Sequence, residues 1–161
     1  MVIFVEELKL NSGLKKIAIK DEDGDLVTVL RVNVADADTA EHFAQIINNL
    51  QEISENCEKE AAEWKKEHDA HADSDAEENF KIEQALQINR IRVKYLKQIA
   101  EEIDKLFGEG TVQSIYGDIT PDETALVEFV EGIIPVMNKL FGKRYEMTRK
   151  RYNSGRKGAR A

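Results

Sequence analysis

The order of apolar and polar residues changes its period once along the chain. In the first third, three short β-branched runs alternate with turn-forming segments; the runs are residues 2–8, 14–20 and 26–34. Residues 11–13 and the Asp-Gly-containing segment 21–25 are typical of the turns that join antiparallel strands. The pattern therefore predicts a β-meander of about three strands in residues 1–36, with one face packed on the remaining chain.

From Asp38 onward, apolar residues recur at alternating steps of three and four, which is the period of an amphipathic helix. The stripe of this first helix covers residues 43–64 and is interrupted by Glu60. Beyond Cys57 the stripe thins and acidic residues dominate, so this end of the helix is predicted to project into water. The acidic residues 68–79, rich in alanine and serine, are predicted to form the tip of a helical hairpin.

The second helix of that hairpin is predicted for residues 75–107. Its heptad stripe covers residues 82–107, with Asn89 as a polar interruption, and further apolar residues widen the face. A face of this width must pack on more than one partner. The pattern is compatible with the protein's own core, with further copies of the chain and with a separate client protein.

A glycine-rich segment, residues 106–121, separates this helix from the last one. A phosphate-binding loop would follow a strand, whereas this segment follows a helix and carries Glu109, which would repel phosphate. Gly108 fits the left-handed residue that follows a helix C-terminus, so the segment is predicted to be a hinge. The residues assigned to hinges are Gly108, Gly110, Gly117, Pro121 and, within the last helix, Pro135.

The last helix has a clear start signal in the sequence. Thr120 is placed as its N-cap, Pro121 at its first position and Glu123 as the capping-box acid. Pro135 removes one backbone hydrogen bond and predicts a kink. The apolar stripe of this helix is a candidate client-binding face, which consists of Leu126, Phe129, Val130, Ile133 and Met137.

Together these elements predict an α+β fold in a single domain. A small N-terminal antiparallel sheet precedes a long helical hairpin and a kinked C-terminal helix. Residues 37–153 form the helical region, and residues 154–161 are expected to be a basic, disordered tail, because they contain too little apolar surface to bury.

The net charge of −8 is unevenly distributed. Residues 1–142 contain 15 Lys+Arg and 30 Asp+Glu, whereas residues 143–161 contain 8 Lys+Arg and one glutamate. The acidic body excludes duplex DNA binding over its surface, because it cannot offset phosphate charge. Nucleic acid binding is expected only through the basic tail, whose candidate residues are Arg149, Lys150, Arg151, Arg156 and Lys157.

The single cysteine, Cys57, excludes an internal disulfide and favours a reducing compartment. The start of the chain lacks the basic region of a signal peptide. No apolar run approaches the ~20 residues that cross a bilayer. We therefore expect a cytoplasmic protein without membrane contact.

Candidate metal ligands and catalytic groups are few. Asp21, Asp23 and Asp25 lack the glycine and glutamate of an EF-hand loop at the required spacing, and are interpreted as a solvated turn. His68 and His71, with nearby acids, lie in the predicted hairpin tip, where the convergence of zinc ligands is not expected. No residue has a recognisable nucleophile context. The sequence thus predicts no metal, no cofactor and no enzymatic activity.

The hinge also carries a resemblance to a known group of proteins. Leu-Phe-Gly-Glu-Gly at 106–110, Gln113, Ile-Tyr-Gly-Asp at 115–118 and a proline-capped helix with Phe129 and Pro135 resemble small proteins of the tail gene modules of long-tailed bacteriophages and prophages. Such proteins are regarded as tail assembly chaperones or as tail-module proteins of unknown role. The resemblance implies a non-enzymatic protein of the bacterial host cytoplasm. It would bind a helical tape-measure protein, or tail-tube subunits, before assembly.

Two alternative functions are compatible with the sequence. The heptad stripes favour self-association, so a homo-oligomeric structural phage protein is one alternative, and a dimer or larger assembly is expected in any case. A nucleic-acid-associated protein that acts through residues 143–161 is the other. Tyr145 and Tyr152 could stack on bases there, although tyrosines at this spacing more often end a buried stripe.

Overall fold

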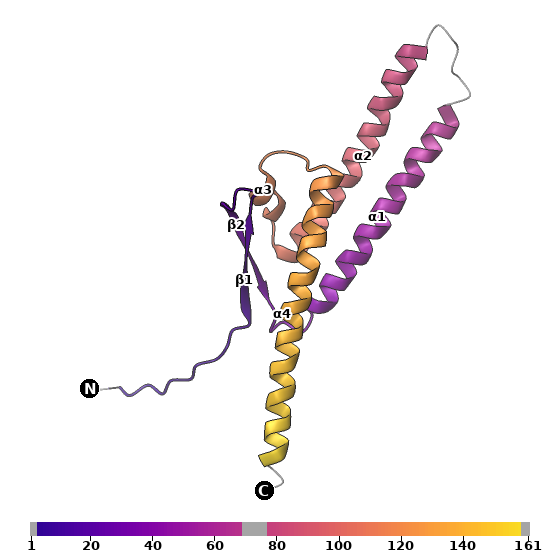
Figure 1. Cartoon of the computed structure of the whole chain (residues 1–161). Helices are drawn as coiled ribbons and strands as arrows, with labels where there is room; N and C mark the ends of the chain where they lie inside the picture. Colours follow the sequence, from indigo (N-terminus) through magenta and orange to yellow (C-terminus); the bar gives the residue numbers. More distant parts are fainter. Residues whose placement is uncertain (1–2, 69–76, 159–161) are drawn as a thin grey trace.

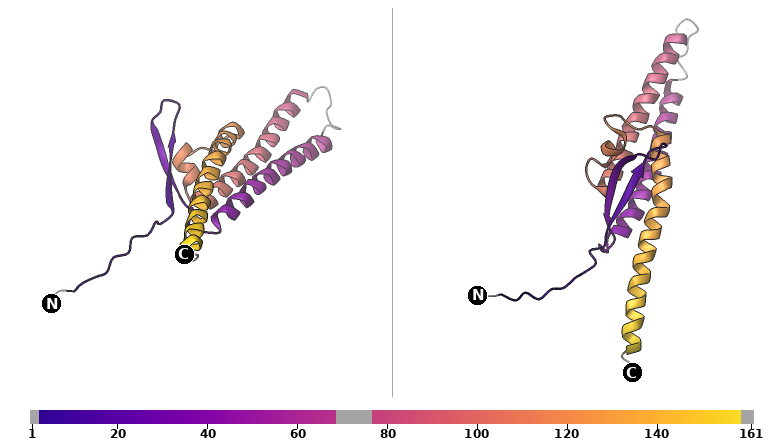
Figure 2. Two further views of the ribbon diagram at one scale, coloured as in Figure 1. Left: turned by 60° about the horizontal axis from the view of Figure 1, so that its bottom comes forward. Right: turned by 60° about the vertical axis from the view of Figure 1, so that its left-hand side comes forward.

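The computed structural model describes residues 3–68 and 77–158 (Figure 1). Within these residues a strand pair precedes a series of helices, which confirms the predicted α+β fold. The strands are β1 (Leu14–Lys20) and β2 (Leu26–Asn33), and the helices are α1 (Thr39–His68), α2 (Glu77–Phe107), α3 (Thr111–Tyr116) and α4 (Glu123–Gly158). The α1–α2 pair projects from the body at one end, and α4 extends beyond the body at the other (Figures 1 and 2).

The strands form an antiparallel hairpin in which Ile17 faces Leu30. Their turn is fixed by Asp21, whose carboxylate accepts hydrogen bonds from the backbone N–H groups of Asp23 (3.0 Å) and Asp25 (2.9 Å). The three aspartates therefore act as the predicted turn. Ile17 and Leu30 lie on the inner face of the hairpin and are buried against the helices.

The predicted third strand is wrong for the described residues. Residues 3–10 are extended, pair with neither strand and lead away from the body (Figure 1). The chain turns outward at Gly13, where φ is 73°. The Asn11 side chain accepts a hydrogen bond from the Gly13 N–H, and the Gly13 carbonyl accepts one from the Val34 N–H, both at 2.9 Å. A Cβ at Gly13 would lie 2.4 Å from the Cβ of Ala35, so only glycine fits this turn.

The helical hairpin is held in register by a polar contact in its apolar seam. The Glu60 carboxylate of α1 accepts hydrogen bonds from the Lys94 ammonium, at 2.8 Å, and from the Tyr95 hydroxyl of α2. Glu60, which interrupts the sequence stripe, therefore has partners on the opposite helix. The predicted hairpin tip lies largely outside the described residues, since residues 69–76 are not described.

The glycine-rich segment is the predicted hinge. Gly108 follows the last residue of α2 with φ 112°, and its N–H donates to the Asp104 carbonyl at 2.8 Å. The Asp104 carboxylate also accepts a hydrogen bond from the Val112 N–H at 2.9 Å, which connects the end of α2 to the start of α3. Gly110 and Gly117 flank α3 and also have positive φ. Positive φ favours glycine at all three positions.

The start of α4 differs from the predicted start. Its cap is Asp122 rather than Thr120, because the Asp122 carboxylate accepts the Ala125 N–H at 2.9 Å. Pro121 is buried and precedes the helix. The helix continues through Pro135, and the predicted kink there stays a prediction. The boundary predicted at residue 154 is wrong, since α4 remains helical to Gly158; residues 159–161 lie outside the described residues.

Two clusters of buried apolar side chains form the core. The first joins the inner face of the sheet to α1 and α4, and comprises Ile17, Leu30, Val32, Val34, Phe43, Ile133 and Met137. The second joins α2, α3 and α4, and comprises Leu96, Ile103, Val112 and Leu126. Phe107 and Phe129 contact both clusters and meet edge-on, with ring centroids 6.0 Å apart.

The candidate client-binding face of α4 is part of this core. Leu126, Ile133 and Met137 are buried, and Phe129 and Val130 are partly buried against the same clusters. The prediction that this face binds a client is therefore wrong. The face is used to hold α4 on the sheet and on α2, which was the alternative compatible with the sequence.

Candidate protein-binding surface on the helical hairpin

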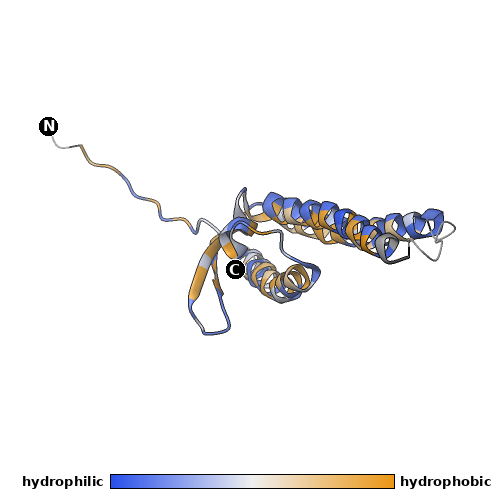
Figure 3. Cartoon of the chain, turned by 90° about the horizontal axis from the view of Figure 1, so that it is seen from above, coloured by the Kyte–Doolittle hydropathy of each residue, from blue (hydrophilic) through white to orange (hydrophobic). Residues whose placement is uncertain are grey.

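One heptad stripe of α2 runs from the core into solvent. We define the α2 stripe as Ile82, Leu86, Asn89, Val93, Leu96, Ala100, Ile103 and Phe107. Its Leu96 is 4% exposed, whereas Leu86 is 52% and Ile82 is 61% exposed. Figure 3 shows apolar residues along the side of the hairpin that faces α4, and polar residues along the opposite side. The distal stripe, Ile82 to Asn89, is therefore an uncovered continuation of a core surface.

The start of α4 marks the point at which the stripe loses its cover. The Glu123 carboxylate, in the first turn of α4, binds the Arg92 guanidinium of α2, with Arg92 Nη2 2.6 Å from Glu123 Oε2. This hydrogen-bonded pairing lowers the pKa of Glu123 and raises the pKa of Arg92. Leu96 lies one turn further toward the hinge and packs against Leu126 of α4. Leu86 lies before this point and has no such cover.

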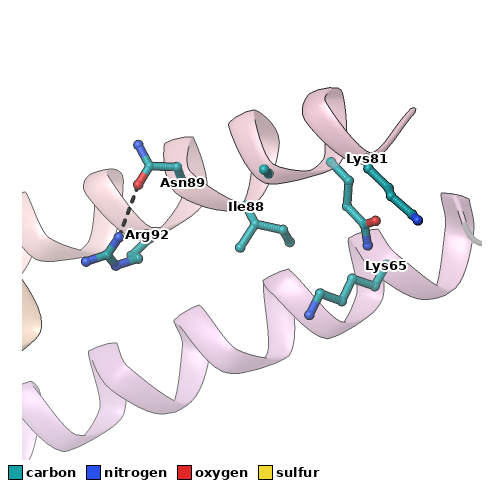
Figure 4. Close-up of a pocket in the computed structure, with 7 residues that line it drawn as sticks. Lys65, Lys81, Ile88, Asn89 and Arg92 are labelled. Carbon is teal, nitrogen blue, oxygen red and sulfur yellow. Dashed lines mark hydrogen bonds between the residues drawn. The ribbon is translucent and has the colours of Figure 1, made fainter. Parts of the chain in front are cut away.

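A groove between the two helices of the hairpin borders the distal stripe (Figure 4). Its floor includes Ile88, which points toward α1, and its rim carries the Lys65, Lys81 and Arg92 side chains. Arg92 also donates to the Asn89 amide oxygen at 3.2 Å. The groove thus combines an apolar floor with cationic side chains, in a protein whose net charge is −8. Lys65 on the rim favours an acidic residue beside an apolar segment, whereas the Arg92 charge is already paired with Glu123.

The hairpin keeps this surface in a fixed geometry. Hydrogen bonds from Lys94 and Tyr95 lower the pKa of Glu60, and the same contacts raise the pKa values of Lys94 and Tyr95. The Lys94 ammonium also lies 4.7 Å from the centre of the Tyr95 ring, within the range of a cation–π contact. A carboxylate with these partners specifies how α1 and α2 align.

The candidate chemical groups of the sequence do not form a reactive or metal site among the described residues. His68 stacks on Trp64 with ring centroids 4.2 Å apart, and its Nδ1 lies 2.8 Å from the Trp64 carbonyl. His71 lies outside the described residues. Within residues 3–68 and 77–158, no three His, Cys, Asp or Glu side chains are grouped to hold a metal ion. Burial, followed by the charges of nearby glutamates including Glu123, raises the pKa of the Cys57 thiol, which disfavours its nucleophilic form.

The basic residues of the C-terminus extend along a helix away from the core. Arg149, Lys150 and Arg151 are exposed on α4, and Arg156 and Lys157 belong to its last turns. Tyr145 and Tyr152 are each 68% exposed, so they do not end a buried stripe. No helix in the described part of the chain is long and apolar enough to cross a membrane.

Comparison with protein families gives a match over residues 27–161, from β2 to the end of the chain. The chain belongs to DUF6673, a family of unknown function. The DUF6673 match includes the hairpin, the hinge and α4, and begins after β1. No curated protein and no solved structure matches the chain.

The distal stripe could be identified from the heptad pattern, but its exposure could not. Ile82 and Leu86 have the same spacing as the buried members of the stripe. Their exposure depends on where the hinge places the start of α4 along α2. The pairing of Arg92 with Glu123 marks where α4 starts along α2. These two residues are 31 positions apart, and no pattern in the sequence links them.

Proposed function

We propose that this DUF6673 protein is a non-enzymatic assembly chaperone or adaptor of a phage or prophage tail module. In this proposal it acts in the cytoplasm of the bacterial host and binds a helical segment of a client such as the tape-measure protein. The exposed distal stripe of α2, which continues a stripe already used for helix packing, is the observation that carries the proposal. The resemblance of the hinge to tail-module proteins supplies the biological setting.

A helix is the occupant that best suits this surface. The proximal part of the stripe packs on a helix, α4, through Leu96 and Leu126. Ile82, Leu86 and Asn89 continue the same spacing, so a client helix could lie beyond the start of α4 on the same face of α2. Lys65 at the adjacent groove favours an acidic residue along one flank of the client.

The charge of the protein is consistent with a chaperone role. A protein that exposes large apolar side chains needs charge elsewhere to remain soluble without its client. The acidic body carries that charge, because residues 1–142 contain twice as many acidic as basic residues, 30 against 15. A tape-measure protein is long and helical, so the short exposed stripe on each chaperone could shield one segment of it.

Co-expression with the tape-measure protein encoded in the same tail module tests the proposal. Leu86→Asp and Ile82→Asp are compared with Val127→Asp, a matched control at an α4 residue that is 51% exposed and lies outside the stripe. Each Leu or Ile buried on binding contributes roughly 1.5–3 kcal/mol, so the double variant should weaken the complex by about 100-fold or more. Val127→Asp should bind as the parent does. Equal binding by all variants, or no complex with the parent, would contradict the proposal.

A nucleic-acid role is a second candidate, favoured by the exposure of Tyr145 and Tyr152 beside basic residues. They lie seven positions apart on one face of a projecting helix, where rings could stack on bases. If this role holds, the affinity for a single-stranded oligonucleotide should fall steeply with salt. Replacing Arg149, Lys150 and Arg151 with glutamate should weaken binding and reduce that slope. Titrations at several salt concentrations measure both quantities, and weak binding that the triple variant does not change would exclude the candidate.

A further inference from the structure

The first described residues form an extended arm without a partner. We define the N-terminal arm as residues 3–10. Its five large apolar side chains are all highly exposed, from 75% for Ile3 to 90% for Phe4. Figures 1 and 2 show the arm leading away from the sheet and from every helix. Proteins do not usually expose so many large apolar residues of one short segment to water. Such a segment often marks a binding site for a partner.

The sheet has a free edge at β1, where another strand could add. Within the described residues the sheet contains only β1 and β2, so β1 has one edge without a neighbouring strand. A groove of about 590 Å³ lies beside β1, between the sheet and the helices α3 and α4. Its apolar lining includes Ile17, Ile19, Ile115, Phe129, Ile133 and Val136. A strand added to this edge would place alternate side chains in the groove.

The arm is complementary to this edge in length and in pattern. It has eight residues against seven in β1. In an extended conformation, Phe4, Leu8 and Leu10 share one face, and Ile3 and Val5 share the other. Either face therefore offers apolar side chains to a groove.

The charges of the arm and the sheet are complementary too. The two strands contain Lys15, Lys16, Lys20 and Arg31 and no acidic residue. The arm contains Glu6 and Glu7 with a single basic residue, Lys9. Lysines on an edge strand discourage indiscriminate strand addition, whereas a strand with adjacent glutamates can neutralise them. The two strands are therefore suited to an acidic, apolar strand such as the arm. This complementarity concerns the strands alone, because the lining of the adjacent groove also carries Asp21, Glu22 and Glu128.

We propose that the N-terminal arm of one copy adds as a third strand to the free edge of β1 in a second copy, with its apolar side chains in the adjacent groove. Two copies that exchange arms reciprocally form a closed dimer. The sequence pattern of three strands is then completed between chains rather than within one. This inference does not depend on the proposed function, since it concerns the sheet and not the distal stripe.

The turn before β1 favours exchange over pairing within the chain. An arm that paired with its own β1 would have to reverse direction over residues 11–13. That turn is already committed to another geometry, because Gly13 is hydrogen-bonded to Asn11 and to Val34 and packs against Ala35. The Ser12 hydroxyl also accepts a hydrogen bond from the Leu14 N–H at 3.3 Å. The chain leaves the sheet outward, away from its own β1 (Figure 1).

Light scattering on the full chain and on a chain starting at Asn11 gives the first test. The parent should have at least twice the mass of one 18.3 kDa chain at micromolar concentration, and the truncated chain should have the mass of one. The double variant Phe4→Asp with Leu8→Asp should raise the dissociation constant at least tenfold. Unchanged circular dichroism and melting of the dissociated variants would show that the fold is intact. A parent that is a monomer, or a truncated chain with the same mass and dissociation constant as the parent, would overturn the proposal.

Cross-linking between differently marked chains separates exchange from pairing within a chain. In a Cys57→Ser background, one chain carries Val5→Cys and the other, with a larger tag, carries Ala18→Cys on β1. A short bis-maleimide should join the two chains, and Thr148→Cys in place of Ala18→Cys should give no product. A product formed only when both cysteines are in one chain would overturn the proposal.

Charge reversal adds an independent test of the register of charges. Glu6→Lys with Glu7→Lys should weaken the dimer, because the arm would then repel the basic strands. Lys16→Glu with Arg31→Glu in a second chain should restore association with that arm at least tenfold. If the reversed arm associates as the parent does, the charges of the arm do not contribute to association. That result would contradict the proposed pairing of an acidic arm with basic strands.

Discussion

The two halves of α2 have the same heptad pattern, but one half is buried and the other is exposed to solvent. Leu96 and Ile103 are buried beneath α3 and α4, whereas Ile82 and Leu86 lie in solvent. Residue type does not distinguish them, since both halves carry leucine and isoleucine. The difference arises from the hinge, which returns the chain so that α4 starts beside Arg92. The period of a stripe therefore identifies the apolar face of a helix, but chain connectivity decides what covers it.

The apolar stripe of α4 differs from the distal stripe of α2 in the same way. The stripe of α4 looks like a binding face in the sequence because it is strongly apolar. In the structure that stripe packs against the sheet and the proximal half of α2, so it is buried within the chain. An apolar stripe stays exposed where one helix extends beyond the helix that covers it, as α2 extends beyond the start of α4.

The largest expected effect is the difference in unfolding free energy between leucine truncations in the two halves of α2. Leu96→Ala removes buried methyl groups from a packed core and should cost about 2–5 kcal/mol of unfolding free energy. Leu86→Ala changes a 52% exposed side chain and should cost less than about 0.5 kcal/mol. Urea denaturation followed by circular dichroism measures both values.

Protein concentration is the control for this pair of variants. Equal costs for Leu86→Ala and Leu96→Ala would mean that the distal stripe is buried in the folded state. If the cost for Leu86→Ala rises with protein concentration, the distal stripe is covered by another copy, and the homo-oligomeric alternative gains support over client binding.

The hinge residues that create the difference between the halves should give the next largest effect. Gly108 and Gly110 both have positive φ, at 112° and 83°, and the Cβ of another residue would meet open space there. The cost of substitution is therefore backbone strain, on the order of 1–2 kcal/mol for Gly108→Val. Gly110→Ala should cause a loss of similar size, because the φ of Gly110 is also positive. Thermal melts with and without ATP measure the effect; stabilisation of the parent by ATP would restore the phosphate-loop hypothesis.

Local features of the fold could be predicted from the sequence because each has a local physical cause. The turn at Asp21, the left-handed Gly108 and the change from strands to helices depend on residues within a few positions of one another. The cap at Asp122 could not be predicted because Thr120 and Asp122 are both good N-cap residues, and the local sequence does not decide between them.

The features that sequence could not provide are long-range. The arm has a clear strand pattern, but its pairing depends on the turn at Gly13 and on Ala35, which is 22 residues away along the chain. Glu60 interrupts the α1 stripe, and its partners Lys94 and Tyr95 lie 34 and 35 positions away. For the candidate site, the residues of the distal stripe were in the predicted seam, whereas their exposure required the placement of α4.

The smallest expected effect concerns the charged pairs that join α2 to α1, through Glu60, and to α4, through Glu123. The pKa values of Glu60 and Glu123 are lowered from their ordinary value of 4.5. A carboxyl group with a lowered pKa contributes stability above its unfolded pKa, and that contribution is lost as the pH falls through the folded value. The melting temperature should therefore fall as the pH drops below about 4.5. The raised pKa of Lys94 acts in the opposite range, so its contribution is present below 10.5 and is lost as the pH rises through the folded value.

Glu60→Gln isolates this contribution, because glutamine keeps an acceptor for Lys94 and Tyr95 but cannot titrate. Its melting temperature should depend less on pH than that of the parent in the acidic range. Glu63→Gln, at an exposed α1 position three residues further along, should leave the pH dependence of the parent unchanged. The side chains of Lys94 and Glu60 are 52% and 37% exposed, so solvent screens this pair and the shift should be small. Identical pH profiles for the parent and Glu60→Gln would show that Glu60 aligns the two helices through its shape and hydrogen bonds rather than through its charge.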